Sequence, residues 1–561
     1  MASRHSHHTT TNSQVMSRRA FINGSVTAAA AAAVIGGGAV GASAATDRPG
    51  KTAPLGDRPV RTQSGLVSGT GALLPGVTVY KGIPFAASTA GENRWRPPRP
   101  PASWTGVRAA DTFGDVCPQT SLSGATIPFP MSEDCLNLNV WTSAAAPGER
   151  RPVFVWIYGG RFVGGYGCDP TYDGAGLARK GLVVVTLNYR TSAYGFLAAP
   201  QLTAESRHGS SGNYGLLDQI AALRWVQQNI AAFGGDPDNV TIAGQSAGSE
   251  SVLQHVFSPL SRGLFHRAIL ESGAFYPKDS QIGALATSYR TLAHAESLGT
   301  AWLKEVGVTT LAEARALSTA ALLTGTADND TGIATVAAID GYPPVWRPVL
   351  DGWLMPQTYW DTMRSGAQSD VPIINGNNKD ENGAAPNPSV TLAAFEKWAR
   401  TYYPPLADEF LKLYPATSNA TAGLLTNEAI QERDRVSGYD WARLWAQRAS
   451  SPVYTYYWTH AAPNRNQGAY HGSEIFYVFD NLYATTAPWT ATDYDIADTL
   501  SDYVVNFATS SDPNGSGLPS WKPTSGAQTV MEIGDSWGQI PLASAAKTEF
   551  FRQFFALQRP W

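Results

Sequence analysis

The sequence predicts an α/β fold with a central, mostly parallel, twisted sheet and helices on both faces. Short apolar runs rich in β-branched residues recur along the chain without polar alternation, as expected of parallel strands covered on both faces. Segments with helical spacing separate several of these runs. The chain has 561 residues, 15% of them charged, with 54 Gly and 37 Pro. This composition is typical of a globular protein with an ample core and many turns.

Six apolar runs predict the strands of this sheet. The strongest runs lie at residues 153–157, 182–187, 240–243, 268–270, 371–374 and 453–457. Between the second and third runs, apolar residues from Leu216 to Ile230 recur at near-helical spacing, which indicates a strand-helix-strand unit. Residues 281–365 and 386–450 are rich in helix formers, and we expect large helical insertions there over the active site. We expect residues 46–561 to form a single domain.

Residues 1–45 have the features of a signal peptide. Ser17-Arg18-Arg19 precedes a small-residue apolar run from Val26 to Val40, and Ala42-Ser43-Ala44 is a candidate cleavage site. The paired arginines predict export by the twin-arginine route. An uncleaved membrane anchor is the alternative, but a run of mostly Ala and Gly gains little from lipid. We therefore expect a secreted, extracellular protein without stable membrane insertion after cleavage.

Charge and cysteine content exclude other classes of protein. The net charge is −4 without a long basic run, which argues against a nucleic-acid partner. Among the three cysteines, Cys117 and Cys135 could close a small loop after export, and Cys168 would then stay unpaired. Cys and His residues do not cluster with metal-ligand spacing, so we expect neither a metal nor another cofactor. Oligomeric state is not indicated.

The candidate nucleophile is Ser246. Gly244-Gln245-Ser246-Ala247-Gly248 follows a predicted strand and opens an apolar helix that contains Val252 and Val256. This context is typical of the nucleophile elbow of α/β-hydrolases, where a strained turn between close-packed segments leaves no room for Cβ atoms at the glycines. An ordinary strand-to-helix turn is the alternative interpretation.

A serine hydroxyl needs a base, which a carboxylate must orient. In this fold the chain order is Ser, acid, His. That order leaves His460 and His471, and we favour His471 because it lies in a loop well beyond the last strong strand. The acid should follow the strand at 371–374, where Asp380 and Glu381 are adjacent, and spacing alone does not choose between them.

Acyl transfer also needs donors for the developing oxyanion. The turn Tyr158-Gly159-Gly160-Arg161 follows the strand that ends at Ile157. Its backbone N–H groups at Gly160 and Arg161, with that of Ala247, are the candidate oxyanion hole. A plain glycine turn is the alternative.

From about Gly65 to the C-terminal aromatic helix, the chain resembles the type-B carboxylesterase and cholinesterase family. The matching motifs are Tyr80–Ala86, Glu133–Val140, Tyr158–Gly160, Phe233–Pro237 followed by Val240–Ile242 and the elbow, His471–Glu474 with Tyr477–Phe479, and Asp512–Gly515. The resemblance implies an α/β-hydrolase fold and ester hydrolysis. It also implies Glu381 as the acid, a Cys117–Cys135 disulfide, and a buried structural ion pair between Arg94 and Glu133.

Two departures from the family pattern bear on substrate choice. The residue before the nucleophile is often Glu in the family but is Gln245 here, and the third residue of the oxyanion turn, usually Gly or Ala, is Arg161. A charge a few Å from the reacting atoms contributes up to a few kcal/mol at an effective dielectric of about 20. We hypothesise that the two changes favour neutral or carboxylate-bearing esters over cationic choline esters. Alternatively, Arg161 folds away onto a loop carboxylate.

The predicted reaction is hydrolysis of small to medium esters through an acyl-enzyme. Ser246 attacks the ester carbonyl, His471 transfers the proton, and Glu381 holds the imidazole. Two alternatives within the enzyme class are a lipase and an esterase of plant phenolic acids, the feruloyl type. A non-catalytic binding module of the cholinesterase type is the alternative from another class, and the presence of all three candidate catalytic residues argues against it.

Overall fold

A computed structural model describes residues 55–121, 124–325, 328–333, 341–463 and 466–561. The predicted signal peptide at 1–45 lies outside these residues. The core of the fold is a large sheet whose parallel strands are β7 (Arg151–Ile157), β8 (Val183–Leu187), β9 (Gly235–Gln245), β10 (Arg267–Glu271), β13 (Ile373–Asn378), β14 (Val453–Trp458) and β15 (Thr529–Ile533). Antiparallel strands β3 (Thr70–Gly71), β4 (Thr78–Pro84), β6 (Asn137–Thr142) and β16 (Gly538–Pro541) complete it.

The strand order is β16-β15-β14-β13-β10-β9-β7-β8-β6-β4-β3. All six apolar runs singled out in the sequence are parallel strands in the middle of this sheet, so the predicted fold class is confirmed. Two small sheets lie outside it. The first contains β1 (Val60–Arg61), β2 (Leu66–Ser68) and β5 (Val107–Ala109), and the second contains β11 (Arg290–Thr291) and β12 (Val349–Leu350).

Helices cover both faces of the sheet. Side chains of adjacent strand residues point to opposite faces. Asn375 in β13 donates a hydrogen bond to the Gly438 carbonyl in α14 (Asn419–Trp445), while its neighbour Ile374 faces Val504 of α16 (Ala491–Ser510) across a small cavity. Helices α14 and α16 therefore lie on opposite faces. The predicted helix between β8 and β9 is α5 (Tyr214–Asn229), and α6 (Ala247–Phe257) follows β9.

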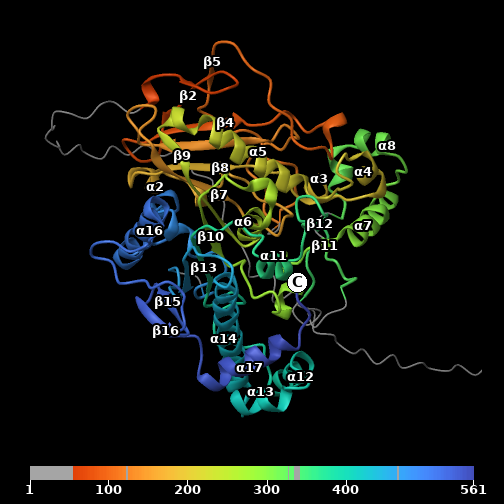
Figure 1. Ribbon diagram of the computed structural model, residues 1–561, viewed down its shortest axis with the longest axis vertical. Coiled ribbons are helices and arrows are strands. Elements are labelled where there is room, and N and C mark those ends of the chain that lie inside the picture. Colours follow the sequence, from red (N-terminus) through yellow and green to blue (C-terminus); the bar gives the residue numbers. More distant parts are fainter. Residues whose placement is uncertain (1–54, 122–123, 326–327, 334–340, 464–465) are drawn as a thin grey trace, which may run out of the picture.

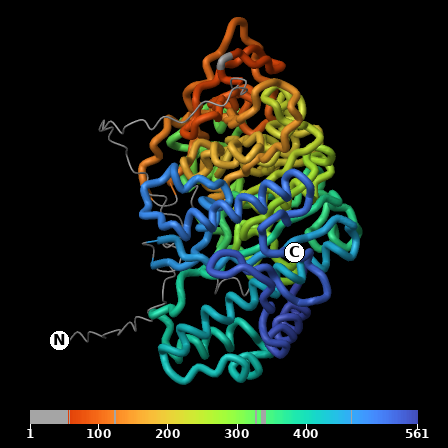
Figure 2. The backbone as a smooth tube through the Cα atoms, turned by 90° about the vertical axis from the view of Figure 1, so that its left-hand side faces the viewer, coloured from red at the N-terminus to blue at the C-terminus, as the bar shows by residue number. Residues whose placement is uncertain are grey.

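The segment 386–450 is only partly an insertion. Its long helix α14 packs against β13 and β14 and thus connects two neighbouring core strands. The part of the segment that leaves the sheet comprises α12 (Leu392–Tyr402) and α13 (Ala407–Leu413), which form a second aromatic core with α17 (Ala545–Ala556). Figure 2 places this part at the end of the molecule opposite the N-terminal strands. The expectation of an insertion across the whole segment was therefore too broad.

The segment 281–365 does leave the sheet. It carries β11, β12 and the helices α7 (Leu292–Glu305), α8 (Leu311–Ala316), α9 (Thr319–Leu322) and α11 (Tyr359–Ser365). These elements cluster beside the central sheet in Figure 1. Two of its residues, Asn329 and Tyr342, accept hydrogen bonds from Arg161 in the candidate oxyanion turn. This insertion therefore reaches the candidate active site.

Two predicted structural pairs are present. Cys117 and Cys135 form a disulfide, and Cys168 is free and buried. Arg94 and Glu133 form a two-point ion pair, with Nε 2.8 Å from Oε2 and Nη2 bonded to Oε1, and both side chains are buried. Within the described ranges, no helix is long and apolar enough to cross a membrane, and no group of His, Cys, Asp and Glu is arranged to hold a metal ion.

Candidate active site

The elbow at Ser246 has the strained backbone that the sequence predicts. Strand β9 ends at Gln245, α6 begins at Ala247, and Ser246 between them has φ 57° and ψ −127°, a conformation that costs a non-glycine residue of order 1–3 kcal/mol. A Cβ on Gly248 would lie 2.0 Å from the Ile157 carbonyl oxygen. A Cβ on Gly244 would lie 2.5 Å from the Gly248 carbonyl carbon. Only glycines fit at these two positions.

Strand register places the oxyanion turn beside the nucleophile. Strands β7 and β9 are parallel neighbours with Ile157 opposite Gly244, so the turns that follow them meet at the same edge of the sheet. The approach is close, because a Cβ on Gly159 would lie only 3.1 Å from the Ser246 Cβ. The edge that brings these segments together is the carboxyl end of the parallel strands, where open α/β sheets bind their ligands.

Three backbone N–H groups point to no protein acceptor at this edge. The N–H groups of Gly160, Arg161 and Ala247 donate to no atom of the described residues. Gly160 has φ 108° and Arg161 has φ 56°, so both residues of the turn lie in the positive-φ region. Unpaired amides grouped beside a serine are suited to stabilise a developing oxyanion.

His471 and Glu381 are in direct contact. His471 Nδ1 is hydrogen-bonded to Glu381 Oε2, and Glu381 Oε1 accepts the backbone N–H of Asn378 at 2.8 Å. Burial alone would raise the pKa of Glu381, but the His471 charge and these hydrogen bonds lower it below its ordinary value. Burial alone would lower the pKa of His471, but the Glu381 carboxylate raises it above its ordinary value. The pair therefore favours an imidazole that accepts a proton readily.

Ser246 and His471 are not hydrogen-bonded to each other in this structure. The His471 Nε2, which would have to receive the serine proton, is 3.3 Å from Nε2 of Gln245. Both Gln245 and Ser246 precede α6 and lie at the same edge of the sheet as the His471 loop. Catalytic hydrogen bonds are often long or poorly aligned before substrate binds, so this geometry is compatible with proton transfer in the complex.

The two alternatives that spacing left open have other partners. Asp380 is buried and accepts the backbone N–H of Ala469 at 2.8 Å, so it joins the loop that carries His471 to the loop that carries Glu381. His460 bonds Asp493 through Nε2 at 3.0 Å and Asp535 through Nδ1 at 2.9 Å. Neither residue contacts the candidate catalytic pair.

Two buried carboxyl groups near the site were not predicted. Glu250 follows Ser246 by one helical turn, and burial raises its pKa to about 8. Glu474 accepts a hydrogen bond from the Asn378 side chain, and burial raises its pKa to about 7. The signal for Glu250 was its place in an apolar helix directly after the elbow, where a carboxylate is unexpected.

The alternative in which Arg161 folds onto a loop carboxylate is not what the described residues show. Its Nη2 donates to Asn329 Oδ1 at 3.0 Å and to the Tyr342 carbonyl at 3.2 Å, both neutral acceptors. Within the described residues, no carboxylate lies at ion-pair distance from Arg161, and its side chain is partly exposed. The oxyanion turn thus carries a guanidinium group without an anionic partner there.

Comparison with known proteins identifies the family of this chain. The profile of a family described as the carboxylesterase family matches residues 56–397 and 425–550. Fumonisin B1 esterase of Sphingopyxis macrogoltabida is 34% identical over 488 residues, covering 85% of this chain and 86% of that protein. Para-nitrobenzyl esterase of Bacillus subtilis is 36% identical over 436 residues, covering 75% of this chain and 83% of that protein.

Solved structures show the same fold. A carboxylesterase of Geobacillus stearothermophilus aligns with a TM-score of 0.72 and 31% identity, covering 88% of this chain and 99% of that one. A structure of a PNB esterase aligns with a TM-score of 0.71 and 29% identity, again covering 88% and 99%. The chain therefore belongs to the carboxylesterase family and is a carboxylic ester hydrolase of the α/β-hydrolase fold.

Proposed function

We propose that this enzyme hydrolyses carboxylic esters through an acyl-enzyme on Ser246. The serine hydroxyl attacks the ester carbonyl carbon while His471 Nε2 takes its proton, and the resulting imidazolium then protonates the departing alcohol. A water molecule repeats the attack on the acyl-enzyme with His471 again as base, and the carboxylic acid leaves. The cycle consumes one ester and one water molecule and releases one alcohol and one carboxylic acid, so the steps balance.

The contact between His471 Nδ1 and Glu381 Oε2 is the single observation that carries this proposal. It leaves Nε2 as the proton-accepting atom and stabilises the imidazolium that forms during each step. The backbone N–H groups of Gly160, Arg161 and Ala247 donate hydrogen bonds to the carbonyl oxygen as its negative charge develops. Each such donor contributes about 10²–10³ in rate in enzymes of this type.

We propose small to medium esters that are neutral or anionic as substrates. Support comes from the position before the nucleophile, where Gln245 provides an uncharged amide, and from Arg161 in the oxyanion turn. A cationic ester would meet a guanidinium group without meeting a compensating carboxylate at residue 245. Choline-type esters are therefore expected to be poor substrates.

A direct test compares the wild type with Ser246→Ala on 4-nitrophenyl esters of increasing acyl length and on the methyl ester of a phenolic acid. We expect Ser246→Ala to turn over these esters about 10⁶-fold more slowly than the wild type, as for the loss of a serine nucleophile in other triads. The length profile separates a short-chain esterase from a lipase. Undiminished turnover by the variant would refute the assignment of Ser246.

We also propose that the chain is exported by the twin-arginine route with residues 1–45 as its signal peptide. Support comes from Arg18-Arg19 ahead of the apolar run and from the Ala42-Ser43-Ala44 site. The N-terminal sequence of the enzyme recovered from the medium tests this. Replacement of both arginines by lysine should retain the enzyme in the cell.

A further inference from the structure

Arg161 belongs to the candidate oxyanion hole through its backbone and also carries a charged side chain. Its own N–H is one of the three unpaired amides, so a bound carbonyl oxygen would lie about 3 Å from its backbone nitrogen. The guanidinium then extends toward the 281–365 insertion, where Nη2 is held by Asn329 and Tyr342. Its Nε and Nη1 donate to no described residue. Among the described residues, two donors of this guanidinium group therefore have no acceptor, on a residue whose backbone N–H is part of the candidate oxyanion hole.

The nearest carboxyl group does not compensate this cation. Glu250 is buried within electrostatic range of Arg161, but its Oε1 is engaged by the Thr287 hydroxyl and its Oε2 has no partner within the described part of the chain. Burial raises the pKa of Glu250 to about 8, so the carboxyl group is mostly protonated at pH 7.

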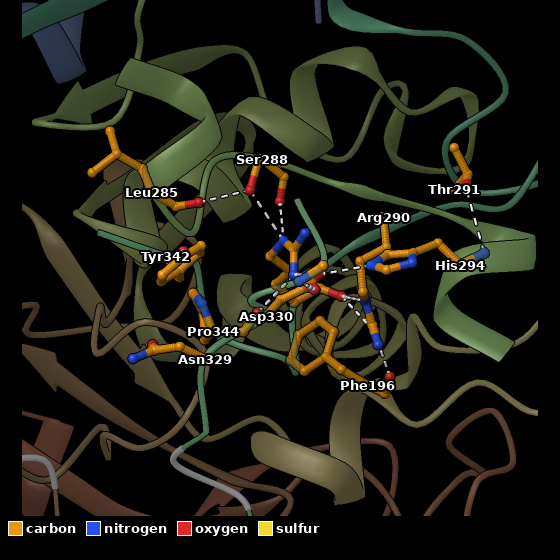
Figure 3. Close-up of polar contacts among 12 residues, drawn as sticks. Phe196, Leu285, Ser288, Arg290, Thr291, His294, Asn329, Asp330, Tyr342 and Pro344 are labelled. Atoms are coloured by element: carbon orange, nitrogen blue, oxygen red, sulfur yellow. Dashed lines mark hydrogen bonds and ion pairs between the residues drawn. The ribbon is translucent and has the colours of Figure 1, made fainter. Parts of the chain in front are cut away.

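The residues behind Arg161 add further positive charge. Asp330 Oδ2 is shared between Arg347 Nη1, at 3.0 Å, and His294 Nε2, at 2.8 Å, and Arg347 also lies within electrostatic range of Glu250. The neighbouring Arg290 bonds only carbonyl oxygens. Figure 3 shows Asp330 between Arg290 and His294 on one side and Asn329 and Tyr342 on the other.

This network is buried and incompletely paired. Arg347 and Arg290 are 0% and 1% exposed, and Nη2 of the first and Nη1 of the second have no hydrogen-bond partner within the described ranges. Arg347 and Arg290 both lie within electrostatic range of the Asp330 carboxylate, and burial lowers the pKa of each guanidinium group. Arg161 is the partly exposed guanidinium group beside this network, and it is the one that an anion from solution can reach.

The position of the guanidinium indicates which part of the substrate it meets. A bound ester directs its carbonyl oxygen to the amides and its alcohol oxygen to His471, which must protonate it. The acyl substituent takes the remaining direction. Arg161 is anchored on the 281–365 insertion through Asn329 and Tyr342, and it donates no hydrogen bond to a described residue of the His471 loop. The acyl side is therefore the side on which its charge acts.

We infer that Arg161 makes this esterase selective for substrates whose acyl part carries a free carboxylate, such as half-esters of short dicarboxylic acids. The inference rests on the proposed function, because it assumes that the ester carbonyl binds at the amides beside Ser246. Arg161 is a specificity-determining residue in this account. The acyl carboxylate accepts hydrogen bonds from Nε and Nη1, in the two-point geometry that guanidinium groups favour.

The test uses a matched pair of substrates: the mono-4-nitrophenyl ester of glutaric acid and its methyl-capped neutral analogue, each corrected for spontaneous hydrolysis. We expect the ratio of kcat/KM for the anionic ester to that for the neutral ester to fall about 10- to 100-fold in Arg161→Gln. Arg161→Lys keeps the charge and should retain part of the preference. Arg443→Gln, which removes an exposed arginine of α14, should leave the ratio unchanged.

A measurement on the wild type alone keeps the test independent of how the variants fold. Raising ionic strength should lower kcat/KM for the anionic ester and leave that for the neutral ester unchanged, because salt screens a partly exposed charge. Placing the carboxylate on the alcohol part instead should remove the preference. A ratio that is the same in wild type and Arg161→Gln, with the neutral ester still hydrolysed, overturns the inference and leaves the proposed function standing. Loss of the proposed function would instead appear as undiminished turnover in Ser246→Ala.

Discussion

Replacing Glu381 by Gln should move the acid limb of the pH–rate profile to lower pH. In the wild type the Glu381 carboxylate outweighs burial and raises the pKa of His471 above 6.5. Two unit charges about 4 Å apart interact by about 4 kcal/mol at an effective dielectric of 20, which is an upper bound for the effect of this charge. Without that charge, less opposes the effect of burial, so the pKa of His471 should be lower than in the wild type.

The sign of the effect follows from which form of His471 is active. The neutral imidazole is the base, so kcat/KM rises as pH passes upward through the His471 pKa. The limb should therefore lie at lower pH in Glu381→Gln than in the wild type. The plateau should also fall, by up to about 10⁴, because the imidazole loses its orientation. The assay is kcat/KM for a neutral nitrophenyl ester from pH 5 to 9.

Asp380→Asn is the matched control. Asp380 is the neighbouring carboxylate, but it accepts the Ala469 N–H instead of contacting His471. Its replacement should leave the limb where it is in the wild type, even if the variant is less stable. A limb that stays in place in Glu381→Gln, or that moves in Asp380→Asn instead, would refute the assignment of the acid.

Three further substitutions test the scaffold. Gly248→Ala should abolish activity or the yield of folded protein, because the new Cβ would lie 2.0 Å from a backbone oxygen of β7. Expression level and ester turnover measure this effect, and an active variant would contradict the elbow geometry. Glu133→Gln should lower the free energy of unfolding by about 3–5 kcal/mol, since the charge of Arg94 stays buried without its partner. Urea unfolding measures this change, and a decrease below about 1 kcal/mol would be evidence against the ion pair as a stabilising contact. Replacing Cys117 and Cys135 together by Ser should lower that free energy by about 3 kcal/mol under the chain-entropy model, and an unchanged urea midpoint would count against a stabilising disulfide.

Local features of this protein could be predicted from sequence because neighbouring residues determine them. The elbow was recognisable because close backbone contacts restrict Gly244 and Gly248 to glycine. The central strands were recognisable because both of their faces are buried, which removes polar alternation. The antiparallel strands β4 and β6 were missed because residues such as Lys81 and Asn139 interrupt their apolar runs.

Other features depend on contacts distant in sequence. Spacing did not choose between Asp380 and Glu381, because the choice depends on which side chain turns toward His471 and which toward Ala469. The contact between Gln245 and His471 joins residues 226 positions apart. Helix α14 was taken for part of an insertion because its apolar positions alone do not show that it packs on β13 and β14.

The most direct test of the central claim is to identify the acylated residue. Wild-type enzyme mixed with a 4-nitrophenyl ester, quenched during the first turnovers and digested, should yield one acylated peptide, with the acyl mass on Ser246. The burst of nitrophenol should match the amount of this peptide. Rapid turnover without acylation, or an acyl group on a different residue, would contradict the proposed mechanism.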